Sequence, residues 1–561
     1  MNSIGQSLGQ HLAIMIALVT LTVPLGIAHC SSASQGAMTS QNRTTKEDSS
    51  STNDKPALPN VYRESSEAQQ VKRTIQVKSG ATSTQNLQSA LDSASAGDVI
   101  VLEAGATFVG NFTLPKKSTA QQGWIVIRST VPDSQLPPKG VRVNPVNAST
   151  FPKIVTPNAD PAINAAPGAH HFRFIGIECT VLPKASTNYG LITFGSSAIT
   201  SLEQLPHDFI IDRCFIHGNP TTNLSRGVAL NCAGAAVIDS YISECHGEGF
   251  DTQAIACWNG SGPFNIFNNY LEAAGENVLF GGADPKIPNL VPSDIVFTHN
   301  TCSKPLSWKP DHPSYAGKHW SVKNLFELKN ARRVLIEGNL FEHNWADAQV
   351  GIAILFTPRN QEGSAPWSVV EDVSFRNNVV RQVAGAINIL GVDYIHPSQQ
   401  TKRIEIRNNL FVEVNGKAWG NGNGVFLTIT EAVNVILDHN TVLQSGNIIS
   451  AYGKVSRKLV FTNNILQHNQ YGIIGDNTGT GWQTLDRYFQ IKQFKHNAFI
   501  GGQQSSYPLS NFFFQSFEEI GFTNPAAGLY ELLMASPLKG RGTDGKDVGC
   551  DMDDLRKAMD F

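Results

Sequence analysis

Glu327 and Lys329 stand one residue apart, in a segment where they alternate with Phe326 and Leu328. In a β-strand that buries Phe326 and Leu328, alternation turns Glu327 and Lys329 outward, side by side on one face. A carboxylate next to an ammonium group can take part in acid–base chemistry. An outward Glu-x-Lys pair is also a common solvated surface feature, and these residues alone leave both interpretations open.

A repeat along the chain predicts the elements that position this pair. Seven segments share the pattern apolar-x-apolar-x-x-Asn-apolar, at loose spacings. The pattern predicts short strands that bury one face, and an Asn in the left-handed conformation that makes each bend and hydrogen-bonds its neighbours in a stack. The alternative is an antiparallel sandwich, but Asn at one constant offset favours identical coils. The repeated positions are Asn269, Asn300, Asn339, Asn378, Asn409, Asn440 and Asn464, and weaker copies place Ile177, Cys214 and Tyr241 in the Asn position.

Both ends of the repeat carry further signals. Leu87, Leu91 and Ala94 predict an amphipathic helix, followed by Gly97-Asp98 and a strand, which suits a cap over the open end of a solenoid. With this cap, residues 71–560 resemble the right-handed parallel β-helix proteins of the pectate lyase-like superfamily, and residues 536–553 resemble their closing segment. The resemblance implies an all-β fold: a single-stranded right-handed parallel β-helix (solenoid) with an N-terminal capping helix, an Asn ladder and about ten to thirteen coils.

In proteins of this fold each coil has three strands, and the sheet of first strands floors the usual substrate groove. Applied to this chain, the resemblance puts outward polar residues of neighbouring coils within reach of Glu327 and Lys329. The predicted catalytic residues are Lys329, Glu327 and Arg359, and the predicted substrate contacts on this sheet are Asn277, Asp284, Asn388 and Asp393.

This constellation fits acid–base chemistry on an acidic sugar, and the Glu-x-Lys pair is loosely similar to the alginate lyase and chondroitinase B group. A lyase must neutralise a uronate carboxylate, remove the C5 proton and release the leaving oxygen. Calcium or an Arg can do the first, and a Lys whose pKa is lowered by a cation can do the second. Glu327 and Asn277 are the candidate calcium ligands, although the second glutamate of that group's calcium motif is not clear here.

The longest insertion in the strongly repeating part is rich in aromatic residues. It spans residues 302–322 and leads into the Glu327 strand. Rings on a loop above a polar groove suit stacking on sugars, and the alternative is that they pack on the flank of the helix. The predicted sugar contacts from this loop are Trp308, Tyr315, Trp320 and His319.

The N-terminal part predicts export. Leu12–Ala28 is uncharged and apolar, so residues 1–30 read as a signal peptide, with a lipidated Cys30 or an uncleaved anchor as alternatives. Residues 31–70 are Ser/Thr-rich and predict a disordered linker before the β-helix domain of residues 71–561. We therefore expect a secreted or periplasmic protein with no membrane contact beyond the signal peptide.

Composition limits the partners. The net charge is −3 and no block of Lys and Arg stands out, which argues against a nucleic-acid partner. Six of the eight cysteines lie between residues 179 and 302 and predict buried core thiols, with one or two disulfides as the alternative.

The leading functional expectation is a secreted polysaccharide lyase that cleaves a uronate-containing polymer by β-elimination, as a monomer and with calcium as a candidate cofactor. The alternatives are a glycoside hydrolase or epimerase on the same scaffold, and a non-catalytic glycan-binding or surface β-helix protein.

Overall fold

The computed structural model describes residues 54–59, 71–80, 83–119, 123–183 and 187–559. The predicted signal peptide, Cys30 and most of the predicted linker lie outside these residues. None of the described helices is long and apolar enough to span a membrane.

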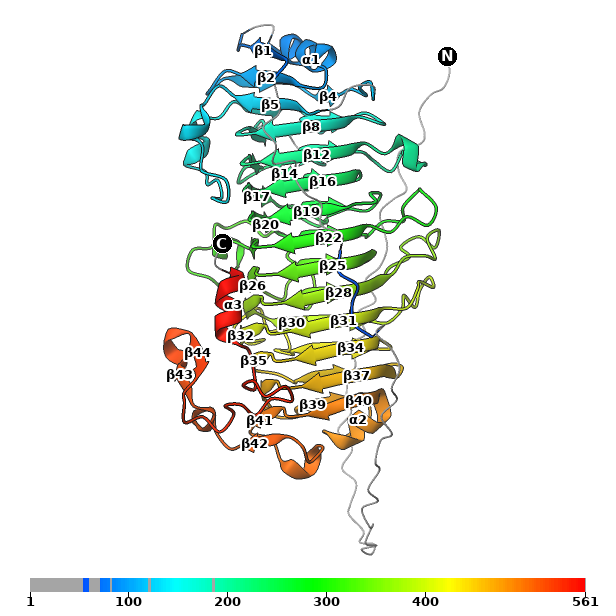
Figure 1. The fold of residues 1–561 in the computed structure, drawn as a ribbon, viewed down its shortest axis with the longest axis vertical. Coiled ribbons are helices and arrows are strands. Elements are labelled where there is room, and N and C mark those ends of the chain that lie inside the picture. The colour runs from blue at the N-terminus through cyan, green and yellow to red at the C-terminus, as the bar shows by residue number, and fades with distance from the viewer. Residues whose placement is uncertain (1–53, 60–70, 81–82, 120–122, 184–186, 560–561) are drawn as a thin grey trace, which may run out of the picture. The chain divides into compact units, whose positions relative to one another are not determined.

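Three long parallel sheets wind around one core, which confirms the predicted β-helix (Figure 1). Each complete coil contributes one strand to sheet A, one to sheet B and one to sheet C, in that order, and the turns at the two ends lack a sheet C strand. Sheet A consists of β1 (Arg73–Val77), β2 (Asp98–Leu102), β5 (Ile125–Ser129), β8 (His170–Ile175), β12 (His207–Asp212), β16 (Ala233–Ile238), β19 (Phe264–Phe267), β22 (Ser293–Thr298), β25 (Ala331–Glu337), β28 (Val370–Arg376), β31 (Lys402–Arg407), β34 (Val433–Asp438), β37 (Ser456–Thr462) and β40 (Phe489–Lys495). Sheet B consists of β3 (Thr107–Val109), β6 (Lys153–Thr156), β9 (Glu178–Val181), β13 (Phe215–His217), β17 (Tyr241–Cys245), β20 (Tyr270–Ala273), β23 (Thr301–Ser303), β26 (Leu340–Asn344), β29 (Val379–Val383), β32 (Leu410–Val414), β35 (Thr441–Gln444), β38 (Ile465–Gln467), β41 (Ala498–Ile500) and β42 (Phe512–Phe514).

Sheet C carries the predicted site. It is 12-stranded, which agrees with the predicted number of coils. Its strands are β4 (Phe112–Leu114), β7 (Ile163–Ala165), β11 (Ile192–Phe194), β15 (Arg226–Ala229), β18 (Gln253–Cys257), β21 (Glu276–Phe280), β24 (Asn324–Leu328), β27 (Ile352–Phe356), β30 (Gly385–Leu390), β33 (Leu427–Thr430), β36 (Ile449–Ala451) and β39 (Ile473–Gly475). Two small two-stranded sheets stand apart: β10 (Thr187–Asn188) with β14 (Asn223–Leu224), and β43 (Phe522–Asn524) with β44 (Leu529–Leu532).

Side chains do not alternate strictly at the start of the sheet C strands. Leu325 and Phe326 both belong to the core, and so do Ala353 and Ile354 one coil further on. Two successive inward residues turn the corner from sheet B into sheet C, and alternation begins only after them. The residue before this corner pair therefore faces outward, which determines the polar surface of sheet C.

The predicted Asn ladder is present at every predicted position and is longer than predicted. Asn269 Nδ2 donates to Asn300 Oδ1 at 3.0 Å, and the same contact repeats from coil to coil as far as Asn497 and Asn511. Because each buried amide both donates and accepts, the ladder satisfies the polar groups of the bends.

Two details of the predicted bend are wrong. The left-handed residue is the one before the ladder Asn, such as Asn268 with a φ of 52°. Among the weaker upstream copies, Ser240 takes the Asn position and Tyr241 does not, because Asn269 Oδ1 accepts from Ser240 N at 2.9 Å.

Helices close and flank the solenoid. Helix α1 (Ser83–Ser93) covers the N-terminal end with Leu87 and Leu91, as predicted, and α2 (Trp482–Tyr488) packs Leu485 against the last coils. The C-terminal segment does not close the far end. It runs back along sheet B, where α3 (Met552–Met559) packs Met552 and Leu555 on Leu410 and Val412 (Figure 1).

Cysteines and the described part of the predicted linker complete the fold. Within the described residues all seven cysteines are free thiols, and the six between 179 and 302 are buried as predicted. The carboxylate of Asp54 lies 3.2 Å from Lys458 Nζ and 2.8 Å from Lys492 Nζ, so this part of the predicted linker contacts sheet A.

Candidate functional site

The outer face of sheet C carries a cluster of paired charges around Glu327 and Lys329. The structure turns both outward, since Phe326 and Leu328 lie in the core and Lys329 Nζ lies 3.5 Å from Glu327 Oε1. Glu327 also accepts hydrogen bonds from Asn324 Nδ2 at 3.2 Å and from Thr357 Oγ1 at 3.3 Å. We call the residues of this cluster the lysine–carboxylate patch: Asp251, Gln253, Glu276, Lys323, Asn324, Glu327 and Lys329.

Glu276 is a central member of the patch that the sequence analysis missed. It pairs in register with Gln253 on one side and Asn324 on the other. Gln253 Nε2 donates to Glu276 Oε2 at 2.7 Å, and Lys323 Nζ lies 3.6 Å from Glu276 Oε1. Burial, followed by the nearby charge of Asp251, raises the pKa of Glu276 above its usual value. Its position just before an inward corner residue was the signal that could have identified it.

Both lysines of the patch are ammonium groups at neutral pH. Glu327 raises the pKa of Lys329 above its usual value, against the effect of burial. Burial alone would lower the pKa of Lys323, but Glu276 and Asp251 raise it, and Lys323 Nζ pairs directly with the Asp251 carboxylate. The expectation of a lysine with a lowered pKa therefore does not hold for the protein without a bound cation.

The lysines of the patch are more accessible than its two glutamates, whereas the Asp251 side chain, which pairs with Lys323, is 47% exposed. The side chains of Lys323 and Lys329 are 17% and 19% exposed, whereas those of Glu276 and Glu327 are 0% and 2% exposed. A ligand that approaches sheet C therefore meets the two ammonium groups and the Asp251 carboxylate, with the two glutamates held beneath the lysines.

Arg359 lies beside the patch, as predicted. Its backbone N–H donates to Lys329 O at 2.8 Å, and its guanidinium lies 3.1 Å from Asp393 Oδ1. The Asp393 side chain is 1% exposed and also accepts from Asn360 N at 3.0 Å. Asp393 thus holds Arg359 and its loop in place, which corrects the prediction that Asp393 contacts substrate.

Asp284 and Asn277 are also structural. Asp284 is buried, and its Oδ2 accepts from Glu362 N, Ser364 N and Ser364 Oγ, which ties two loops together. Asn277 occupies the inward corner position equivalent to Leu325, so the predicted outward orientation is wrong. Its amide donates to Leu271 O and Ser303 O at 2.7 and 2.9 Å.

A buried lysine fills the corner next to Asn277. Lys304 Nζ donates to Asn277 Oδ1 at 2.9 Å and to four backbone carbonyls between sheets B and C. Burial lowers the pKa of Lys304 to about 7. Because the contacts come from residues 273–275 and 324, Lys304 holds the two strands that begin with Glu276 and Asn324.

The aromatic loop packs mainly on the flank of the helix. Trp308 and Trp320 are buried in a cluster with Trp345 and Val322, and Trp320 stacks on His246 at a ring distance of 3.7 Å. Their predicted stacking on a sugar is wrong, because these rings are already covered. Tyr315 and His319 remain accessible, and His319 Nε2 lies 2.6 Å from Asp347 Oδ1.

Two further features bear on ligands at this face. Asn388 lies on the outer face between Leu355 and Thr428 and stays a predicted substrate contact.

Three buried oxygens of the patch have no hydrogen-bond partner: Gln253 Oε1, Glu276 Oε1 and Asn324 Oδ1. They lie at one level of three adjacent strands, and carboxylate and amide oxygens are the ligands that Ca²⁺ prefers. The oxygen set fits calcium, and Lys323 can keep its other partner, Asp251.

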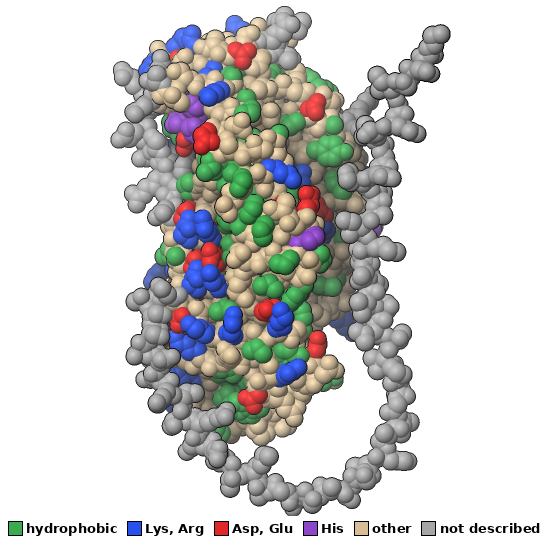
Figure 2. All heavy atoms as spheres, turned by 90° about the vertical axis from the view of Figure 1, so that its right-hand side faces the viewer, with side chains coloured by type: hydrophobic (Ala, Val, Ile, Leu, Met, Phe, Trp, Pro, Cys, Tyr) green, Lys and Arg blue, Asp and Glu red, His purple; other side chains and the backbone are tan. Residues whose placement is uncertain are grey.

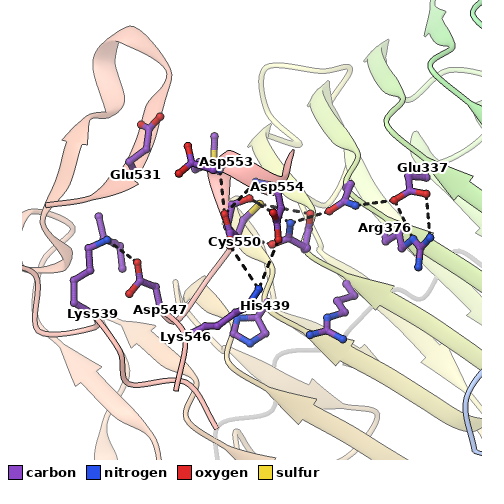
Figure 3. A pocket seen from close by; sticks show the side chains of 16 residues that line it. Glu337, Arg376, His439, Glu531, Lys539, Lys546, Asp547, Cys550, Asp553 and Asp554 are labelled. Carbon is purple, nitrogen blue, oxygen red and sulfur yellow. Dashed lines mark hydrogen bonds and ion pairs between the residues drawn. The ribbon is translucent and has the colours of Figure 1, made fainter. Parts of the chain in front are cut away.

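A pocket of about 430 Å³ lies elsewhere, between the A–B bends and the C-terminal segment (Figure 3). Its charges pair with one another: Lys539 Nζ lies 2.7 Å from Asp547 Oδ2 and Arg376 Nε lies 3.0 Å from Glu337 Oε1. The C-terminal segment docks on the bends here, where His439 Nε2 lies 3.3 Å from Asp544 Oδ2 and Asp551 N donates to Asn408 Oδ1 at 2.6 Å. We therefore keep the patch on sheet C as the candidate site.

Solved structures with similar folds are parallel β-helix proteins. No protein-family model matches the chain, and a search of curated proteins finds no relative. The alginate lyase AlyGC, of the PL6 family, is 14% identical over 85% of this chain and 58% of its own, with a TM-score of 0.45. The surface adhesin PfbA of Streptococcus pneumoniae is 11% identical over 70% of this chain and 92% of its own (TM-score 0.38), and a family 28 exopolygalacturonase of Yersinia enterocolitica is 10% identical over 79% and 78% (TM-score 0.33). These similarities show the fold alone.

Proposed function

We propose that the protein cleaves a uronate-containing polysaccharide by β-elimination at the lysine–carboxylate patch. The observation that carries the proposal is the layering of the patch, with Lys323 and Lys329 accessible and Glu276 and Glu327 buried beneath them. Accessible ammonium groups attract the carboxylates of an acidic polymer, and buried carboxylates hold those groups in place.

Lys329 is the proposed proton-transfer residue. A neutral Nζ can take the C5 proton of the uronate while the C4–C5 double bond forms and the C4–O bond breaks. The resulting ammonium can then return the proton to the leaving oxygen. Glu327, 3.5 Å away, keeps Nζ in position through both steps. Arg359, held by Asp393, is the proposed partner of a neighbouring sugar carboxylate.

Calcium is the proposed cofactor. Gln253, Glu276 and Asn324 would hold it through the three oxygens that have no hydrogen-bond partner, and the ion would take the place of Lys323 beside Glu276. When bound, the ion supplies positive charge that neutralises the uronate carboxylate and lowers the pKa of the neighbouring lysines.

A hydrolase is less well supported. Glycoside hydrolysis needs a carboxylic acid that reaches the glycosidic oxygen. The carboxyl groups of Glu276 and Glu327 lie beneath the lysines, and the accessible Asp251 carboxylate is paired with Lys323. A non-catalytic binding protein for acidic glycans is the second candidate, because ammonium groups that are charged at rest suit binding without proton transfer.

One assay separates these functions. Purified protein is incubated with pectate, alginate and chondroitin, with and without chelator. A lyase produces unsaturated ends that absorb in the ultraviolet, a hydrolase adds only reducing ends, and a binding protein is retained on the polymer without either product. The proposal would be contradicted if no polymer in a broad panel of uronate polymers gave an ultraviolet-absorbing product.

Two further measurements address location and assembly. Cell fractionation checks the proposed secreted or periplasmic location, and light scattering checks the proposed monomer.

A further inference from the structure

Two neighbouring strands of sheet A begin with residues of the types that commonly ligate metals, His and Asp. Strand β8 begins with His170-His171 and the next strand, β12, begins with His207-Asp208. The strands are parallel neighbours, with His170 opposite His207. Figure 2 shows histidine side chains beside acidic ones near the N-terminal end of the molecule. This cluster lies on sheet A and shares no residue with the patch on sheet C.

The side chains converge on one point. One ligand atom from each of His171, His207 and Asp208 lies within 4.8 Å of the other two. Asp208 Oδ2 lies 2.7 Å from His207 Nδ1 and 3.7 Å from His171 Nδ1. Ligand atoms of a tetrahedral Zn²⁺ site are about 3.3 Å apart when the bonds to the metal are about 2.0–2.1 Å long. Changes of up to about 1.5 Å in the distances between these atoms, reached by side-chain rotation, would bring them to that spacing.

The cluster is accessible to ions in solution. The side chains of His171, His207 and Asp208 are each about one-third exposed, at 36%, 38% and 33%.

His170 supports the cluster from behind. It is buried, stacks on the His207 ring at 4.8 Å, and its Nδ1 lies 2.9 Å from His171 Nδ1. Its Nε2 also lies 3.3 Å from Lys117 O. The stacking holds the His207 ring in place, and metal binding would replace the hydrogen bond between His170 and His171 at His171 Nδ1.

We propose that His171, His207 and Asp208 bind a divalent transition-metal ion of the Zn²⁺ type, which clips strand β8 to strand β12. Each coil of a solenoid contacts only its neighbours, and β8 and β12 are the fourth and fifth strands of sheet A, near the capped end. An ion shared by two successive coils stabilises that end of the molecule. Three protein ligands leave one coordination position for water.

Zinc titration tests the proposal. Metal-stripped full-length protein without a histidine tag is titrated with Zn²⁺ by calorimetry, and we expect one ion per chain. Asp208→Asn and His207→Gln should each weaken binding about tenfold or more. The matched control is His312→Gln, in the 302–322 loop, which should bind as the wild type does. Circular dichroism checks that each variant is folded.

Two outcomes would overturn the inference. One is an absence of stoichiometric Zn²⁺ binding by the wild type, and the other is unchanged binding by both ligand variants. Thermal unfolding gives a second readout, because an ion that binds only the folded protein raises its Tm. The rise should be present in the wild type and the His312 variant and absent from the ligand variants. If those variants fail to fold, Co²⁺ added to the wild type should give the intense visible absorption of tetrahedral coordination, and its absence counts against the site.

Discussion

Lys329 Nζ lies 3.5 Å from Glu327 Oε1, and only the lysine of this pair is accessible from outside. The ammonium group is therefore placed and charged by a carboxylate beneath it. This arrangement differs from a solvated surface pair, in which both groups are exposed and the interaction is weak. The position and charge of Lys329 therefore depend on Glu327. Substitutions at these two residues should change activity and stability by different amounts.

Replacement of Lys329 should abolish turnover at a moderate cost in stability. Lys329→Met removes the proposed proton carrier, so we expect kcat to fall about 10³-fold or more on a polymer that the wild type cleaves. It also leaves the buried Glu327 carboxylate without its ammonium partner, which should cost about 1–3 kcal/mol of unfolding free energy. Assays of initial rate and denaturant unfolding check both.

Two variants serve as controls for Lys329→Met. Lys454 pairs with Glu431 at 3.1 Å on the surface, so Lys454→Met should change neither quantity. Adding Glu327→Gln to Lys329→Met should restore stability and leave the protein inactive. Full activity of Lys329→Met would show that the proton carrier is another residue.

The activity should rise with pH on the alkaline side. Glu327 raises the pKa of Lys329 above its usual value, so the neutral amine that takes the C5 proton becomes more abundant as the pH increases. Glu327→Gln removes the main cause of the raised pKa and should shift the rising limb of kcat/KM to lower pH. A rate that falls steadily above pH 7 in the wild type would contradict this role.

Calcium removal should inactivate the enzyme reversibly. Chelation should lower kcat/KM about 10–100-fold, and added Ca²⁺ should restore it. Glu276→Gln should raise the Ca²⁺ concentration needed, because it removes one charged ligand, whereas Glu431→Gln on the surface should not. Calorimetric Ca²⁺ titration gives a readout independent of activity. Equal Ca²⁺ affinity in wild type and Glu276→Gln would exclude these ligands.

The free energy of unfolding should decrease as the pH rises from 4.5 to 7, because of Glu272 on sheet B. Burial raises the pKa of Glu272 to about 7 from a model-compound value of 4.5, and its carboxyl contacts Tyr270 Oη at 3.0 Å. In this range the folded protein holds a proton that the unfolded chain has released, so the free energy of unfolding decreases as the pH rises. The loss should be about 3 kcal/mol.

Glu272→Gln supplies the comparison for this pH effect. Its amide cannot titrate, so the part of the pH dependence due to Glu272 should disappear. Denaturation midpoints at pH 4.5 and 7.5 measure the difference. The same slope in both proteins would assign the pH dependence to other groups.

Local and repeated patterns were predictable from the sequence. The Asn positions recur at one offset because each coil repeats the same bend, and each bend depends on residues a few positions apart. The outward orientation of Glu327 and Lys329 also followed from alternation with Phe326 and Leu328. The repeat pattern did not identify Asn497 and Asn511 as ladder residues, because their flanking residues depart from that pattern.

Side chains at the corners and in the loops depended on contacts between distant residues. Asn277 faces inward because it forms, with Val278, the inward corner pair of β21, and Lys304 Nζ donates a hydrogen bond to its amide oxygen there. Asp284 and Trp320 are covered by residues that are far away in the sequence, Ser364 and His246 respectively. Periodicity carries no information about such partners.

By itself, the sequence determined a β-helix with an Asn ladder and one outward Glu-x-Lys pair, because these follow from short-range periodicity. Only the tertiary structure decided that Glu276 and not Asn277 faces the site, that the glutamates lie beneath the lysines, and that His171 meets His207 and Asp208. Those relationships arise when coils stack about 4.8 Å apart and bring residues distant in the chain into register.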